Sequence, residues 1–281
     1  MPVPIADHPA ARPPFPMDPG RPMSTRRRIL VAALVLLLAV VGVVAWFVWP
    51  RSITPVSENT AVEDFREHTT GTTDLGGAIP DVGVYTYAGT GDERIKFGPL
   101  PTQVRRIPAT VTGIVVASGD RCFTLTVNYF VQHTEDTRYC VTGQGAPRID
   151  QQVKHQDVAS FSVTSTMTCD PSVLLPERPG DAPLDCHLTL TGAPADISMD
   201  LVGRTRRGPD RSVRIGTRTV TIAPVTMTLD ITGSLTGHWI ETTWFTPRHL
   251  PARIDRDFAL TGPATFSERS TLTLRELTPT T

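Results

Sequence analysis

The residue types used in enzyme catalysis occur in this sequence, but their spacing does not assemble a catalytic set. Gly233-Ser234-Leu235-Thr236-Gly237 does not have the order of a G-x-S-x-G nucleophile elbow. His238 and Glu241 are three residues apart, and an odd spacing on a strand directs two side chains to opposite faces. We therefore predict no catalytic residues and a protein that is not an enzyme.

The four cysteines could form disulfides or hold a metal ion. They are Cys122, Cys140, Cys169 and Cys186. An even number of cysteines in an oxidising compartment favours two disulfides, for which three pairings are possible. We favour Cys122–Cys140 and Cys169–Cys186, because each pair is local and flanks a plausible hairpin or loop. Zinc is the competing interpretation, but no pair has C-x-x-C spacing, so we predict no metal and no cofactor.

Charged residues offer two further candidate sites. Asp255 and Asp257 share a strand face and could bind a cation, although the adjacent Arg253 favours ion pairing. A basic stretch could contact an anionic headgroup or a phosphate-bearing wall polymer. Its candidate residues are Arg204, Arg206, Arg207, Arg211 and Arg214. The alternative, which we favour, is a hairpin with Gly208-Pro209-Asp210 at its tip and solvated arginines on its flanks.

Apolar residues that alternate with polar ones could line a ligand cavity. The candidates are Val127, Tyr129, Met227, Leu229, Trp239 and Trp244. An ordinary hydrophobic core is the competing interpretation for the tryptophans, and it is the more common one. If a ligand is bound, we expect an apolar cavity of roughly a few hundred Å³.

An apolar run near the N-terminus is expected to anchor the protein in a membrane. Arg26-Arg27-Arg28 precedes 21 uncharged residues, Ile29 to Trp49. At about 1.5 Å per residue, such a helix spans roughly 31 Å, enough to cross a bilayer core. The arginines predict a cytoplasmic N-terminus. A cleaved signal peptide is the alternative, but the run is long and lacks small residues at a cleavage site.

This run divides the chain into predicted segments. Residues 1–25 are proline-rich and form a disordered cytoplasmic tail, although Met23 could also be the start. Residues 26–50 form the single-pass transmembrane helix, and 51–59 a linker. Residues 60–281 form an extracytoplasmic β domain that begins with a short helix over Ala61–His68, with Thr60 as a possible N-cap.

Within the β domain, the hydrophobic period is two. Phe123, Leu125 and Val127 alternate with threonines, His133–Asp136 resembles a turn, and a return strand follows. We predict a mainly β fold in which a curved antiparallel sheet resembles a half-barrel. The chain has a formal charge of −1, and its exported part about −4, because the N-terminal segment contributes +3. This balance excludes a nucleic-acid-binding footprint.

Three segments carry a resemblance to known proteins. Val62-Glu63-Asp64-Phe65 and Pro80–Tyr87 resemble segments in a group of uncharacterised actinobacterial membrane-anchored envelope proteins. Thr243–Arg253 is similar to a W-x-x-P…L-P-x-R strand–turn–strand signature of lipoprotein-carrier envelope proteins, the LolA/LolB and mycobacterial LppX/LprG groups. This resemblance implies an incomplete antiparallel barrel that holds an acyl chain or lipoprotein. The chain departs from those groups in its transmembrane anchor and its disulfides.

The sequence thus predicts a single-pass protein of the cell membrane. Its extracytoplasmic domain would bind an envelope component (lipid, lipoprotein or partner protein) without catalysis. The alternative is a structural or regulatory interaction module that has no small ligand and meets a partner through its tail or a sheet edge.

Overall fold

The structure is a computed structural model that describes residues 25–48, 53–69, 79–98, 101–119, 121–141, 147–158, 161–170, 172, 174, 179–192 and 196–281. The chain divides into two compact units, Met1–Trp49 and Pro50–Thr281. The predicted disordered tail lies outside the described residues except for Thr25, and so do the first two residues of the predicted linker.

The first unit contains helix α1 (Thr25–Val48), which covers most of the predicted transmembrane segment. Across the described part of the chain, however, no helix has the combination of length and apolar character needed to cross a membrane. The prediction of an N-terminal membrane span is therefore wrong. The predicted single-pass localisation in the cell membrane, which depended on that span, is wrong with it.

The second unit is built from strands. The described residues contain, after helix α2 (Glu58–His68), the strands β1 (Gly83–Phe97), β2 (Gln103–Arg106), β3 (Thr110–Ala117), β4 (Cys122–Phe130), β5 (His133–Val141), β6 (Pro147–Val158), β7 (Phe161–Cys169), β8 (Gly180–Thr191), β9 (Ile197–Arg207), β10 (Arg211–Ile215), β11 (Arg218–Gly233), β12 (Thr236–Phe245), β13 (Pro251–Thr261) and β14 (Ala264–Leu274). The mainly β class predicted from the alternating pattern is confirmed.

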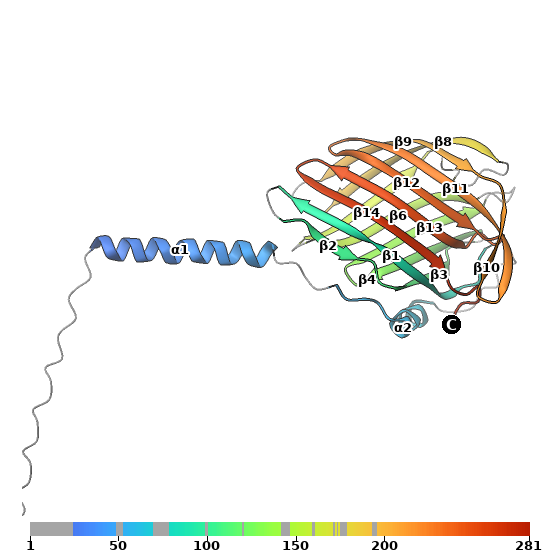
Figure 1. Cartoon of the computed structure of the whole chain (residues 1–281), viewed down its shortest axis with the longest axis horizontal. Coiled ribbons are helices and arrows are strands. Elements are labelled where there is room, and N and C mark those ends of the chain that lie inside the picture. The colour runs from blue at the N-terminus through green and yellow to red at the C-terminus, as the bar shows by residue number, and fades with distance from the viewer. Residues whose placement is uncertain are drawn as a thin grey trace, which may run out of the picture. The chain divides into compact units, whose positions relative to one another are not determined.

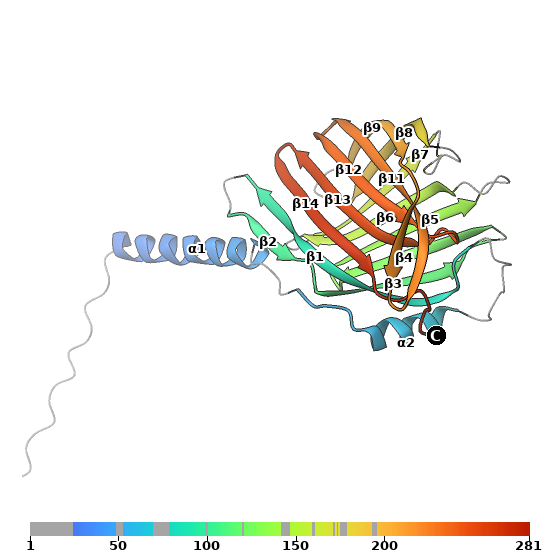
Figure 2. The same cartoon turned by 45° about the vertical axis from the view of Figure 1, so that its right-hand side comes forward.

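These strands form a closed antiparallel barrel (Figures 1 and 2). β9 pairs with β11, from Arg207 opposite Val225 to Met199 opposite Gly233, and this pairing joins the two ends of the sheet. β2 and β10 lie outside the ring, where they pair with β1 and β11, so the barrel itself has 12 strands. The predicted open half-barrel is wrong, because closure removes the exposed edges that an open sheet would keep.

Two predicted turns are also misplaced. The β4–β5 turn is at Val131 and Gln132, and the predicted turn residues 133–136 begin β5. Gly208–Asp210 does not form a hairpin tip, because β10 pairs with β11 and not with β9. The chain leaves β9, forms β10, and reverses direction near Gly216 to enter β11, which then returns alongside β9.

Alternation along each strand separates the inside of the barrel from the outside. In β5, for example, residues 133, 135, 137, 139 and 141 are buried, while the residues between them are partly or fully exposed. Successive side chains of a strand point to opposite faces, so every second residue enters the barrel. Each strand of the ring therefore contributes every second side chain to the interior.

Helix α2 covers part of the outer surface, beside β1 and β3 (Figure 1). The buried residues of this contact are Ala61, Val62, Phe65, Val84 and Ile114. The helix starts before the predicted N-cap: the Ser57 side chain, not Thr60, caps it, accepting a hydrogen bond from the Thr60 amide at 3.1 Å. The helix thus shields the apolar outward residues of two strands from water.

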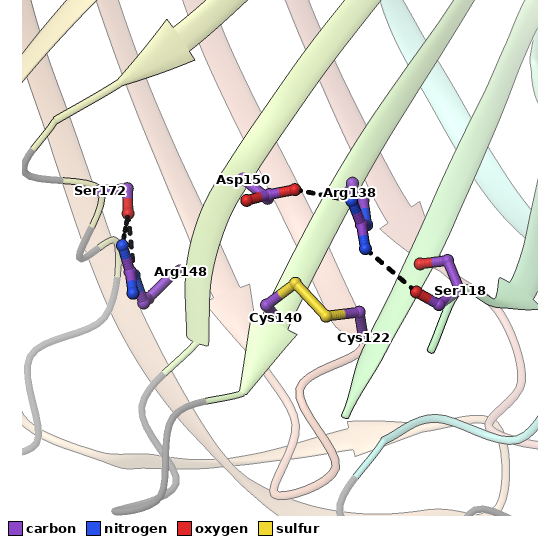
Figure 3. Close-up of a disulfide and its surroundings, with 7 residues drawn as sticks. All are labelled: Ser118, Cys122, Arg138, Cys140, Arg148, Asp150 and Ser172. Carbon is purple, nitrogen blue, oxygen red and sulfur yellow. Dashed lines mark hydrogen bonds and ion pairs between the residues drawn. A yellow bond between two sulfur atoms is a disulfide. The ribbon is translucent and has the colours of Figure 1, made fainter. Parts of the chain in front are cut away.

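Both predicted disulfides are confirmed, and they lie on opposite faces of the barrel wall. Cys122 and Cys140 are directly opposite each other on β4 and β5, with outward parity. On the same outer face, Arg138 donates hydrogen bonds to Asp150 and to the Ser118 carbonyl (Figure 3). Cys169 and Cys186 are opposite each other on β7 and β8, and Cys186 is buried with the interior core.

Candidate functional site

An apolar cavity lies inside one end of the barrel. Its volume is about 410 Å³, within the range of roughly 300–1,000 Å³ typical of small-molecule sites. This end, the tip end, is where β6 connects to β7, β8 to β9, β11 to β12 and β13 to β14. Phe161, which is 42% exposed, lines the cavity at the start of β7 and marks its mouth.

The walls of the cavity come from inward-facing positions of consecutive strands. On β7, Phe161, Val163, Ser165 and Met167 all line it, each two residues from the next. The apolar residues contributed by other strands include Leu188, Leu190, Ile197, Leu260 and Phe266, and Leu235 adds one from the turn between β11 and β12. The period of two that builds the barrel therefore also supplies a continuous apolar wall.

Trp239 and Phe258 lie deepest on the aromatic side of the cavity. Their rings are 5.0 Å apart between centroids, and Phe258 is 5.6 Å from Phe266. The Trp239 indole N–H is the donor of a 3.3 Å hydrogen bond to Glu241, below the cavity. Trp239 was predicted as a lining residue, and the structure places it in the cavity wall.

The floor of the cavity is polar. Gln152 and Lys154 reach it from β6, and Gln156 lines the cavity nearer the mouth. The Lys154 ammonium lies 4.9 Å from the centroid of the Trp239 ring, a cation–π distance. The same ammonium is 3.0 Å from a Glu135 carboxylate oxygen and 3.6 Å from one of Glu268. Lys154 therefore separates the apolar cavity from charged side chains deeper in the barrel.

These deeper side chains form a buried charge cluster, defined as Glu135, Lys154, Glu241, Arg256 and Glu268. Arg256 is its centre, with ion pairs of 2.7 Å to Glu135, 2.7 Å to Glu241 and 3.2 Å to Glu268. Charges buried in a protein interior are tolerated when they are paired and hydrogen-bonded. The multiple contacts of Arg256 meet this condition.

The charge cluster controls the ionisation of its carboxyl groups. Burial by itself disfavours the charged form of Glu268, but the Arg256 and Lys154 charges outweigh burial and lower its pKa to about 2. Burial likewise opposes ionisation of Glu135, and the same two cations lower the pKa of its carboxyl below the usual range. Both carboxyl groups are therefore ionised at neutral pH.

Beside the charge cluster lies a second buried contact, between His133 and Glu93. The His133 ring contacts the Glu93 carboxylate and stacks on Tyr129, with 4.5 Å between the ring centroids. Arg105 faces Glu93 from the neighbouring strand β2 and is also buried. The interior of the barrel thus holds a layer of charged side chains next to the cavity.

Much of the barrel interior is filled by its own side chains. Val127, Tyr129, Met227 and Leu229, four of the predicted lining residues, are buried in this core and do not line the cavity. Phe123, Tyr139 and Phe245 pack nearby in ring contacts of 5.2 and 5.8 Å. An apolar cavity of the expected size thus exists, but these four residues are not in its lining.

Trp244, the last predicted lining residue, is on the outside of the barrel. It is five residues from Trp239 on β12, and an odd spacing reverses the face. The Arg253 guanidinium lies 4.6 Å from the centroid of its ring, and the two residues are register partners on β12 and β13. Trp244 therefore packs in a surface contact and is not part of the site.

The predicted anion-contacting arginines lie away from the cavity-lining residues. Arg204 and Arg206 are exposed on β9, and Arg211 and Arg214 are exposed on β10. Arg207 forms a 2.7 Å ion pair with Asp210. The structure brings no arginine of this stretch to the cavity lining.

The remaining candidate residues form surface contacts. Asp255 pairs with Arg253 at 2.9 Å, and Asp257 lies 3.3 Å from Arg269 and 3.5 Å from His238. Glu241 points inward, so His238 and Glu241 are on opposite faces of β12. Within the described ranges, no group of three or more His, Cys, Asp or Glu side chains is arranged to hold a metal ion.

The fold and the cavity together define the class of protein as a closed antiparallel barrel with an internal cavity. Closed antiparallel barrels larger than the smallest ones enclose ligand cavities or channels, and this barrel encloses a partly apolar one. No protein-family model, curated protein or solved structure matches the chain. The resemblance to lipoprotein carriers therefore remains a prediction, without the incomplete barrel that it implied.

Proposed function

We propose that this protein binds an apolar or amphipathic small molecule inside its barrel, without catalysing a reaction. The cavity of about 410 Å³ is the observation that carries the proposal. Its walls are formed mainly by apolar side chains, which suit an apolar ligand. Protein interiors are normally close-packed, and apolar space of this size is costly to leave empty. A bound apolar ligand removes that cost.

A neutral fluorescent probe, N-phenylnaphthylamine, tests the proposal directly. Ser165 lines the cavity on β7, so Ser165→Trp fills part of its volume. Thr166, the next residue, points to the outer face, and Thr166→Trp is the matched control. We expect the wild type and Thr166→Trp to bind one probe per chain, and Ser165→Trp to bind at least about tenfold more weakly, or about 1.4 kcal/mol.

The midpoint of urea unfolding, measured for all three proteins, establishes that the variants fold. Equal probe binding by folded Ser165→Trp and Thr166→Trp would contradict the proposal, since the probe would then sit outside the cavity. No saturable binding to the wild type would contradict it as well.

A further inference from the structure

The polarity of the cavity floor bears on which end of a ligand can reach it. Among the described residues that line the cavity, Lys154 is the only charged one. A buried lysine at the end of an apolar cavity could in principle bind the acidic end of a fatty acid. Its surroundings decide whether it is available for that role.

The charge of Lys154 is already neutralised by the protein. Glu135 lies 3.0 Å and Glu268 3.6 Å from its ammonium, on the side away from the cavity walls. The whole charge cluster contains two cations, Lys154 and Arg256, and three carboxylates, and so has a formal charge of −1. A ligand carboxylate at this floor would be desolvated beside a negative cluster, which is unfavourable.

The aromatic side of the floor, by contrast, suits an apolar group. Trp239 and Phe258 present ring surface to the cavity, and Trp239 is almost completely buried. The wall from these rings to Phe161 at the mouth is formed mainly by aliphatic and aromatic side chains. The volume, near the lower end of the usual range for ligand sites, fits one chain better than several.

We propose that the ligand is a single-chain amphiphile that enters with its apolar end first, so that the chain end contacts Trp239 and the charged headgroup stays in water at the tip end. This inference rests on the proposed function and adds the ligand class and its orientation. The buried charge cluster acts as a floor that admits uncharged groups and rejects anions.

Two brominated dodecanoates test the orientation, because a bromine atom quenches tryptophan fluorescence at short range. In the full chain, Trp46, Trp49 and Trp244 are replaced by phenylalanine, which leaves Trp239 as the single tryptophan. One probe carries bromine on the terminal carbon (ω-bromododecanoate) and the other next to the carboxylate (α-bromododecanoate). Saturating ω-bromododecanoate is expected to remove most Trp239 emission, and saturating α-bromododecanoate to remove little.

Displacement of N-phenylnaphthylamine by each dodecanoate keeps the two proposals distinguishable. If both acids displace the probe but the α-bromo acid quenches as strongly or more strongly, the apolar-end-first orientation is overturned and the proposed function stands. If the probe binds but neither acid displaces it, the amphiphile class is overturned. If the probe itself does not bind, the proposed function fails.

A second comparison changes the charge of the ligand. Dodecanoate and its methyl ester have the same chain, and only the acid carries a charge. Apolar-end-first binding predicts similar affinities, because the carboxylate remains in water. A large preference for the acid that is lost in Lys154→Met would place the carboxylate at the floor and overturn the inference.

Discussion

Arg256 on β13 binds Glu135 on β5 across the interior of the barrel. The guanidinium donates two hydrogen bonds, of 2.7 and 2.8 Å, to the two carboxylate oxygens. β14, β1, β3 and β4 separate these strands around the sheet, so the pair joins distant parts of the wall. Because a bidentate contact fixes both distance and orientation, it also fixes the floor on which the cavity rests.

Removing the Arg256 charge should therefore destabilise the whole barrel. Arg256→Met leaves the buried carboxylates of Glu135 and Glu268 with Lys154 as their remaining ion-pair partner, and the partly buried Glu241 without its Arg256 partner. Breaking a buried ion pair by removing one partner costs about 3–5 kcal/mol. We expect the free energy of unfolding, measured by urea denaturation, to fall by that amount.

Arg253 provides the matched control, because it lies on the same strand with the opposite parity. It pairs with Asp255 and Trp244 on the partly exposed outer face. Exposed pairs contribute about 0–1 kcal/mol, so Arg253→Met should have a small effect. Comparable losses for the two variants would show that the interior pair has no special role.

Acid should destabilise the fold through Glu268. Its pKa is about 2 in the folded protein, against an ordinary value of 4.5, because Arg256 and Lys154 outweigh the effect of burial. The unfolded chain then binds a proton at higher pH than the folded chain does, so the stabilisation is present above about pH 4.5 and is lost as the pH falls toward 2.

Thermal unfolding between pH 7 and pH 2 measures this effect. Glu268→Gln should lower the melting temperature at pH 7 and flatten its decline in acid, since one titrating group is gone. An unchanged acid slope in Glu268→Gln would mean that other carboxyl groups account for the decline.

The two disulfides should differ in what their removal does. They close chain segments of similar length, with sequence separations of 18 and 17, so the entropic contribution of each is about 3 kcal/mol. Cys186 is buried in the interior core, whereas Cys122 and Cys140 face outward. Replacing the inner pair by serine also buries hydroxyl groups, which adds a cost.

We therefore expect Cys169→Ser/Cys186→Ser to lose more unfolding free energy than Cys122→Ser/Cys140→Ser. Urea denaturation of both double variants, compared with the wild type, measures the difference. A larger loss for the outer pair would contradict the assignment of the two faces.

Local pattern was sufficient to predict parts of this fold. The period of two in β4 and β11 identified strands, and it assigned Val127 and Leu229 correctly to a dry face. The disulfide partners followed from their short separations. The same parity rule distinguishes Trp239 from Trp244, which are five residues apart on β12, so their opposite faces were already readable in the sequence.

Local sequence pattern could predict neither the closure of the barrel nor the charge cluster. The pairing of β9 with β11 depends on β10 leaving the ring, and no local signal in either strand specifies its partner. Glu135 is the register partner of Lys154, and Glu241 is that of Arg256, so these two ion pairs lie within hairpins. The contacts of Arg256 with Glu135 and of Lys154 with Glu268 join distant strands, and local pattern carries no information on them. The cavity depends on where side chains leave space, which only packing determines.

Native mass spectrometry of the full chain, purified under mild conditions, tests the central claim most directly. We predict that the wild type and Thr166→Trp carry an additional mass of lipid size, and that Ser165→Trp, with its cavity filled, does not. An apo mass for the wild type, or the same adduct on folded Ser165→Trp, would contradict the assignment of this cavity as a ligand site.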